Sequence, residues 1–428
     1  MNTEYDVLIS GAGIAGPALA YWLRRAGYRP TVVERAPAPR PGGQAVDLRG
    51  AGRTVVERMG LMEQAREVSL DQKGFALVDA RGSITARVPE DAFGGKGIVS
   101  EIEILRGDLC RLLYEASLPD TEYLFDETIT GIEQDSDGVS VSFARARSRR
   151  FSLVVGADGM HSTVRRLAFG PDSACLRPLN LYNSWFSAPP DIDLGGWFVM
   201  FNAPGGLVAG ARPGREDDIK ASLAFRSEPL EAEPLTPTAQ RELLAQRFAG
   251  AGWEVPRLLD AMWSAPDFFF EPVAQVHLDR WWRGRVTLLG DAACCPTSLS
   301  GMGTSLAIVG AYVLAAELAT AGGDHKAALP RYQERMSAYV KQAQRLPGMG
   351  VAGFAPSSAL SIRIRATSMS WMTRWPMRSL VAGQFTKADA IELPSWEPAA
   401  LSVEKGPNEP VDGCRDVDQV PFPRMGAA

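Results

Sequence analysis

A chain of 428 residues is long enough to bury one large core or two fused domains. Its hydrophobic share of 46% and charged share of 22% are those of an ordinary globular protein, and its net charge of −5 argues against general attraction to nucleic acid or anionic membranes. The five cysteines do not suggest a disulfide framework and no signal-peptide pattern opens the chain, so we expect a cytoplasmic protein.

The first predicted element is a buried parallel strand from Asp6 to Ser10, which leads into an apolar-periodic helix from about Ile14 to Gly27. Three glycines at G-x-G-x-x-G spacing join them. Gly11 permits the tight turn, Gly13 leaves room for a pyrophosphate beside the backbone, and Gly16 lets helix and strand pack closely. The helix N-terminus offers N–H groups and a positive dipole end to the phosphates.

A second buried strand, Thr31 to Val33, ends in Glu34, which can accept hydrogen bonds from a ribose. Strand, glycines and acid together predict a dinucleotide site. The alternative is a glycine-rich turn in an ordinary α/β domain. In the loop that follows, Arg35 and Arg40 are either solvated charges or phosphate partners.

Short elements follow. We predict a helix over Thr54 to Met62, short strands within Lys73 to Val88, a strand passing into a helix between Glu103 and about Ser117, and a hairpin of Thr128 to Glu133 with Gly138 to Phe143. The arginines at the far end of this hairpin have no interleaved aromatic residues, which favours a solvated edge over a nucleic-acid patch. They are Arg145, Arg147, Arg149 and Arg150.

A second strand-turn-helix device begins with the predicted strand Phe151 to Gly156. It places Asp158 at the carboxyl end of a strand, where α/β sheets bind ligands. Ser162 and Arg165 fall on the opening turn of the next helix, and Arg165 could bind a carboxylate or a phosphate. The alternative is that Asp158 only caps the helix and Arg165 lies on the surface.

From about Ala174 to Pro272 the pattern alternates and predicts an antiparallel sheet, with one amphipathic helix over Thr236 to Gly250. A sheet inserted between dinucleotide-binding segments can roof a substrate cavity. Trp197 and Met200 are therefore candidate substrate contacts, and packing within the core is the alternative for both.

A third device starts at the predicted strand within Gly284 to Leu289, which delivers Asp291 to its carboxyl end. A loop and a helix to Leu318 follow, so the helix start is another site for an anion or for a ring edge that needs N–H donors. Asp291 as a simple cap is the alternative. The adjacent Cys294 and Cys295 lack a matching His/Cys cluster, so we predict no metal site.

The apolar run Leu306 to Leu318 is short for a membrane span and carries Glu317, so we expect no stable membrane insertion. A helix is predicted from His325 to about Gln344, and further helices within Leu346 to Phe385 are expected to cover the dinucleotide domain. The basic stretch from Arg363 to Arg378 leaves a membrane-surface helix open as an alternative.

The three devices, GAGIAG with Glu34-Arg35, GADGMHSTVR and GRVTLLGDAA…P…SGMG, resemble the class A FAD-dependent aromatic hydroxylases of the para-hydroxybenzoate-hydroxylase fold. The segment Gly42-Gly43-Gln44-Ala45-Val46-Asp47-Leu48 is similar to one in the branch of tetracycline-inactivating and antibiotic- or polyketide-tailoring monooxygenases. The resemblance covers the chain to about Leu393. It implies an α/β fold with a Rossmann-like FAD-binding domain, an inserted, mainly antiparallel substrate sheet and C-terminal helices.

The implied domain boundaries follow this plan. Residues 1–173 and 273–335 would form the FAD-binding domain, with a short excursion into the substrate domain near 73–100. Residues 174–272 would form the substrate-binding sheet, 336–393 the C-terminal helices and 394–428 a flexible tail.

The resemblance also implies roles for single residues. Glu34 would bind the adenosine ribose of FAD beside Arg35, Arg106 would contact FAD, and Asp291 would bind its ribityl or pyrophosphate portion. Asp158 would support FAD and the nicotinamide cofactor, Arg40 would meet the NADPH phosphates, and Asp47 would lie near the isoalloxazine. The predicted cofactor-binding residues are Gly11, Gly13, Ala15, Gly16, Glu34, Arg35, Arg40, Asp47, Arg106, Asp158, Asp291, Pro296, Gly301, Met302 and Gly303. Many relatives have a His or an aromatic residue where this chain has Cys294, and we predict no covalent flavin attachment.

In the enzymes that this chain resembles, NADPH or NADH reduces FAD, O₂ adds to the reduced flavin, and the resulting C4a-hydroperoxide transfers an oxygen to an electron-rich carbon. We therefore expect an FAD- and NADPH-dependent monooxygenase of a polycyclic aromatic or polyketide-type small molecule. No catalytic side chain can be named from the sequence. The alternatives are a flavin reductase or halogenase of the same fold, although Trp281-Trp282 is not the spaced tryptophan pattern of halogenases, or a non-catalytic flavin-bearing binding protein.

Overall fold

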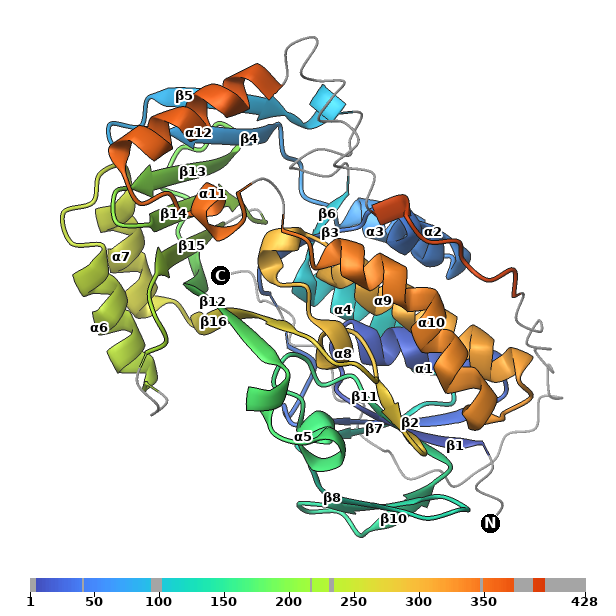
Figure 1. The fold of residues 1–428 in the computed structure, drawn as a ribbon. Coiled ribbons are helices and arrows are strands. Elements are labelled where there is room, and N and C mark those ends of the chain that lie inside the picture. The colour runs from blue at the N-terminus through green and yellow to red at the C-terminus, as the bar shows by residue number, and fades with distance from the viewer. Residues whose placement is uncertain are drawn as a thin grey trace, which may run out of the picture.

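The computed structural model describes residues 5–40, 42–93, 102–215, 218–230, 235–346, 349–372 and 388–396. Two large sheets organise them, one mainly parallel and one mainly antiparallel (Figure 1). Helices fill the space around both sheets. This arrangement confirms the predicted α/β fold class.

The parallel sheet has six strands in the order β17-β18-β11-β1-β2-β7, and only the edge strand β17 runs antiparallel. Its strands are β1 (Asp6–Ser10), β2 (Arg29–Glu34), β7 (Glu122–Phe125), β11 (Leu153–Gly156), β17 (Trp282–Arg283) and β18 (Val286–Leu288). The central strands are continuously apolar because both of their faces are covered. The sheet brings the carboxyl ends of β1, β2, β11 and β18 to one edge.

Helices α1 (Ala15–Arg25), α4 (Arg106–Ser117), α9 (Gly303–Thr320) and α10 (His325–Ala343) pack with this sheet into the largest core. By length and composition alone, α9 is apolar enough to cross a membrane, and it is the one such helix among the described residues. However, 83% of it is buried within the fold, as expected of a core helix.

The second sheet has seven strands in the order β16-β12-β15-β14-β13-β4-β5, all antiparallel to their neighbours except the β13–β4 pair. These are β4 (Gly74–Val78), β5 (Ile84–Pro89), β12 (Leu176–Ala188), β13 (Phe198–Ala203), β14 (Leu207–Pro213), β15 (Ile219–Arg226) and β16 (Phe269–Val276). Helices α6 (Pro237–Arg247) and α7 (Val255–Ser264) contribute Leu244, Leu258 and Met262 to the core on one face. The opposite face looks toward the parallel sheet's strand ends.

Smaller elements connect the two sheets or lie at the periphery of the molecule. Strands β3 (Ala45–Asp47) and β6 (Glu103–Leu105) form a two-stranded ribbon, and β8 (Ile129–Gln134), β9 (Val139–Phe143) and β10 (Arg149–Phe151) form a three-stranded sheet. Arg149 and Arg150 are exposed there and pair with Glu122 and Asp135 at 2.8 and 2.5 Å. This is the solvated edge that the sequence predicted.

The helix predicted over Thr54 to Met62 is divided in the structure. Helix α2 (Gly50–Arg58) begins earlier, and α3 (Met62–Glu67) follows after a break. Gly60 lies between them with a φ of 74°, a left-handed conformation that ends helices. The remaining α-helices are α5 (Thr163–Phe169), α8 (Asp291–Cys294), α11 (Val351–Phe354) and the longer α12 (Ala359–Met372).

The prediction that the C-terminal helices cover the dinucleotide domain is wrong for α12, which lies along β5 and β13 of the seven-stranded sheet (Figure 1). Its Ala366 and Met369 pack against the cluster that contains Phe75 and Leu77, so apolar contact with that sheet fixes its place. Residues 394–396, expected in a loose tail, are bound instead: Tyr312 Oη lies 2.8 and 2.9 Å from the carbonyls of Pro394 and Trp396. The rest of the predicted tail, 397–428, lies outside the described residues.

Candidate active site

A cavity of about 1190 Å³ lies between the strand ends of the parallel sheet and the inner face of the seven-stranded sheet. This exceeds the usual range for one drug-sized ligand, about 300–1,000 Å³. The predicted residues that line it are Gly11, Gly13, Ala15, Glu34, Arg35, Arg40, Asp47, Arg106, Asp158, Met200, Asp291, Pro296, Gly301, Met302 and Gly303. Gly16 and Trp197 are not among its lining residues. The three devices, far apart in sequence, therefore open into one space.

The first device is built for close approach to the backbone. Gly11 has a φ of 106°, and a Cβ there would lie 2.6 Å from the Ala157 carbonyl oxygen. A Cβ at Gly16 would lie 1.9 Å from the Gly11 oxygen, so Gly16 serves helix packing and does not face the cavity. The carboxylate of Glu34 accepts hydrogen bonds from the backbone N–H groups of Ala12 and Ala36, each at 2.9 Å. These bonds orient the acid beside the glycine turn.

The second device combines the two readings of Asp158. This residue lines the cavity, and its carboxylate also accepts hydrogen bonds from the Thr163 and Val164 N–H groups at 2.8 and 3.2 Å. It is thus a cap for α5 at the cavity wall. Arg165 is neither on the surface nor in the cavity. It is fully buried, pairs with Asp172 at 2.6 Å and donates to the Ala292 carbonyl at 3.0 Å, so it ties the second device to the third.

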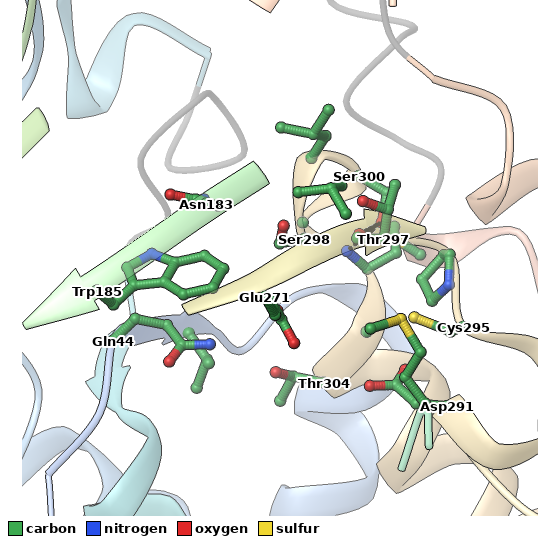
Figure 2. Close-up of a pocket in the computed structure, with 18 of the residues that line it drawn as sticks. Gln44, Asn183, Trp185, Glu271, Asp291, Cys295, Thr297, Ser298, Ser300 and Thr304 are labelled. Carbon is green, nitrogen blue, oxygen red and sulfur yellow. Dashed lines mark hydrogen bonds between the residues drawn. The ribbon is translucent and has the colours of Figure 1, made fainter. Parts of the chain in front are cut away.

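The third device places Asp291 directly after Gly290, at the start of α8. Burial raises the pKa of the Asp291 carboxyl, and the positive charge of Arg106 opposes that rise. Cys295 lies beside it at the cavity wall (Figure 2). Among the described residues no group of His, Cys, Asp or Glu could hold a metal ion, and Cys110, Cys175, Cys294 and Cys295 are free thiols.

The polar groups left without partners fit a bound dinucleotide. A Cβ at Gly13 would lie 3.4 Å from an Nη atom of Arg106, whose guanidinium has no hydrogen-bond or ion-pair partner among the described residues. Asp47 Oδ1 is buried without a hydrogen bond, and Oδ2 lies 3.5 Å from the Cβ position of Gly301. A bare glycine turn, an unpaired guanidinium and an orphaned carboxylate oxygen surround the same space, so the donor set suits FAD.

Sequence reasoning missed a pair of acids at one side of this space. Glu103 lies directly opposite Asp47 in the β3–β6 ribbon. Arg212 contacts Glu103 at 2.9 Å and Arg49 contacts Asp47 at 3.0 Å. Burial raises the pKa of Glu103 to about 8, with a further contribution from Asp47 and opposition from Arg212. Burial therefore favours the protonated form of Glu103 near neutral pH.

Glu271 was also missed, because an acid within the apolar run FFEPVAQV gave no motif. Its side chain projects from β16 into the cavity, between Trp185 and the loop that carries Ser298 (Figure 2). Burial raises its pKa to about 7, the negative charge of Asp291 adds to this, and Arg106 opposes it. Its cross-strand neighbour Asn183 has a buried side-chain oxygen without a hydrogen bond. A carboxyl that titrates near neutrality can take up and return a proton here.

The seven-stranded sheet supplies the aromatic wall. Phe75, Trp185, Phe198 and Met200 line the cavity. Trp197 instead packs on the core beneath α7 and carries Arg87 at 5.1 Å from its ring centroid. Side chains alternate between the faces of a strand, so Phe198 and Met200 of β13 share the cavity face, whereas Trp197 precedes the strand and packs on the other core. The position of Met200 agrees with the prediction, and the structure offers no support for Trp197.

Comparison with known proteins defines the class. The model of the family described as FAD binding domain matches residues 4–346. The chain belongs to this family and is a flavoprotein oxidoreductase of the FAD-dependent monooxygenase class, as its motifs predicted.

Individual relatives support this assignment to the FAD-dependent monooxygenases. An uncharacterised protein of Mycobacterium tuberculosis (strain ATCC 25618 / H37Rv) is 43% identical over 352 residues, which cover 82% of this chain and 94% of that protein. A flavin-dependent monooxygenase of Legionella longbeachae serogroup 1 (strain NSW150) is 35% identical over 345 residues, 81% of this chain and 88% of its own. The crystal structure of tetracycline destructase Tet(55) has a TM-score of 0.77 and 34% identity, and the match covers 92% of this chain and 100% of that one.

Proposed function

We propose that this protein uses NADPH, or NADH, and O₂ to hydroxylate a polycyclic aromatic or polyketide-type small molecule by the flavin C4a-hydroperoxide route. One observation carries the proposal: a single cavity joins the glycine and acid cradle of a dinucleotide site to an aromatic sheet face. Its volume exceeds the usual range for one drug-sized ligand, which supports a large cofactor together with a second molecule. When bound, FAD supplies the redox chemistry, and the protein supplies orientation and shelter from water.

The roles proposed for single residues follow from their places. Gly11 and Gly13 admit the pyrophosphate, Glu34 binds the ribose, and Arg106 and Asp291 hold the middle of the cofactor. The first turn of α9, after Gly303, presents backbone N–H groups that stabilise negative charge on a ring edge.

The outer end of the cradle suits the nicotinamide cofactor. Arg35 and Arg40 line it, and Arg40 is 55% exposed while its guanidinium lies 3.8 Å from Glu34. We propose that Arg40 binds NADPH phosphates.

Proton exchange is assigned to Glu271. Its carboxylate would accept the proton of a substrate hydroxyl: the O–H bond of the substrate breaks, an O–H bond forms on Glu271, and the electron pair stays on the substrate oxygen. The ring carbon then becomes a better nucleophile. The orphaned oxygen of Asn183 beside it can accept a hydrogen bond from a second hydroxyl.

The test is to purify the protein, record its flavin spectrum, and measure NADPH oxidation and product mass with a panel of aromatic polyketides. Tetracycline belongs in the panel because Tet(55) is named a tetracycline destructase. We expect yellow protein, NADPH oxidation stimulated by at least one compound, and a gain of one oxygen. Stimulated oxidation without an oxygenated product would favour a reductase, and bound FAD without any NADPH oxidation would favour a binding protein.

A further inference from the structure

Helix α12 presents one face to the cavity. Ser361, Arg365, Ser368 and Met372 all line it and recur every three or four residues, which is the spacing of one helix face. Their helix lies on β5 and β13, next to the aromatic wall (Figure 1). The single cation on this face is Arg365.

Arg365 has neutral partners only. Its guanidinium donates to Asn202 Oδ1, to the Phe354 carbonyl oxygen at 2.9 Å and to the sulfur of Met200 at 3.4 Å. No carboxylate pairs with it among the described residues, and its Nε–H has no acceptor there. Two other sheet-side cations of the cavity differ, because Arg212 pairs with Glu103 at 2.9 Å and Lys220 with Asp218 at 2.6 Å.

Arg365 is half-buried, and a guanidinium that is partly removed from water without a counter-charge destabilises the protein unless something compensates for it. Burial lowers the pKa of Arg365 to about 10, so it remains charged at neutral pH. Anchoring α12 to β13 requires only hydrogen bonds, which a neutral side chain could make. An anion that pairs with the guanidinium when a ligand occupies the cavity would explain why a charged residue stands at position 365.

We propose that Arg365 binds an acidic group of the substrate, so that the substrate is an aromatic anion whose carboxylate or ionised oxygen lies beneath α12. This inference rests on the proposed function and narrows its substrate class. Phe75 and Phe198, whose ring centroids are 5.2 Å apart, line the same wall and can pack against the attached ring. The phosphate cradle at Gly11 belongs to the other sheet, which favours a substrate acid over a cofactor phosphate at Arg365.

The test measures binding to the FAD-loaded protein without turnover, by quenching of tryptophan fluorescence. The probes are salicylate and 1-hydroxy-2-naphthoate, each compared with its neutral amide. We expect at least one acid to bind about 10- to 100-fold more tightly than its amide, as a charge-assisted hydrogen bond provides. In Arg365→Gln the acid should bind no more tightly than its amide, while the affinity for the amide changes less than about 2-fold. Arg365→Lys should retain part of the preference for the acid.

Arg363→Gln is the matched control, because Arg363 is exposed on the same helix. It should behave as the unmodified protein. Equal binding of both acids and their amides to the unmodified protein would overturn the proposal, as would an unchanged ratio in Arg365→Gln. A 10-fold loss of NADPH affinity in Arg365→Gln would show a cofactor site instead. Flavin content checks folding, and the lysine variant remains informative if the glutamine variant does not fold. Because no turnover is measured, this result is separate from the test for monooxygenase activity.

Discussion

Replacing Glu271 with glutamine tests whether the cavity holds a carboxyl against its normal ionisation. Folding raises the pKa of this group from 4.5 to about 7. An acid whose pKa is higher in the folded than in the unfolded protein does not reduce the stability of the fold at a pH below the unfolded pKa. It destabilises the folded protein progressively as pH rises, and the full penalty is present above the folded pKa.

The size of the effect follows from the shift. A difference of 2.5 between 7 and 4.5 corresponds to about 3.4 kcal/mol at about 1.36 kcal/mol per unit. Because the Glu271 side chain is only half-buried, solvent screens part of this energy, and we expect about 2 kcal/mol. Glu271→Gln should therefore increase the free energy of unfolding of the flavin-free protein by about 2 kcal/mol at pH 8 and by almost nothing at pH 4.5.

Urea unfolding at pH 4.5, 6, 7 and 8 measures this difference. The matched control is Glu133→Gln on β8, an exposed glutamate that should show no gain that grows with pH. A gain for Glu271→Gln that is equal at all four pH values would refute the ionisation argument. Destabilisation at pH 8 would show that the charged carboxylate has a partner that stabilises it.

Three further outcomes are expected. Gly11→Ala should abolish FAD binding, read from flavin absorbance of the purified protein, because its Cβ would lie 2.6 Å from the Ala157 oxygen at a φ of 106°; retained flavin would show that the turn adjusts. Arg165→Met should cost about 2–4 kcal/mol in urea unfolding because the carbonyl oxygens of Met160 and Ala292 lose their buried donor, whereas the exposed Arg166→Met should cost less than about 1 kcal/mol. Met200→Ala should change the KM for the substrate identified in the activity screen and Trp197→Phe should not, and equal effects would place both residues at the cavity.

The parallel sheet and its three devices could be predicted because their signals are local. Each is a short apolar strand followed by glycines or an acid at a fixed spacing, and the requirement for a turn at Gly11 acts within a few residues. Carboxyl ends of neighbouring parallel strands meet at one edge, so the devices had to converge once the fold class was known.

What could not be predicted depends on contacts between distant segments. The local pattern of α12 does not reveal which sheet it packs on, and its place is decided by contacts with the apolar cluster that contains Phe75 and Leu77, about 290 residues earlier. Trp197 and Met200 looked equivalent in composition, yet Met200 lies on the cavity face of β13, whereas Trp197 lies just before that strand and packs on the core that contains α7. Glu271 carried no motif, and its significance appears only when the cavity surrounds it.

The distribution of charge in the cavity connects these observations. Asp47, Glu103, Glu271 and Asp291 would together oppose a bound dianion, which the pyrophosphate of FAD is. Burial raises the pKa of the last three, to about 8 for Glu103 and about 7 for Glu271, so part of the negative charge of these two is removed by protons near neutral pH. An anion bound beside these carboxyls would raise their pKa values further, and by linkage it would bind more tightly to the protonated cavity than to the ionised one. The raised pKa values therefore let one cavity combine an anionic cofactor with acids able to exchange protons.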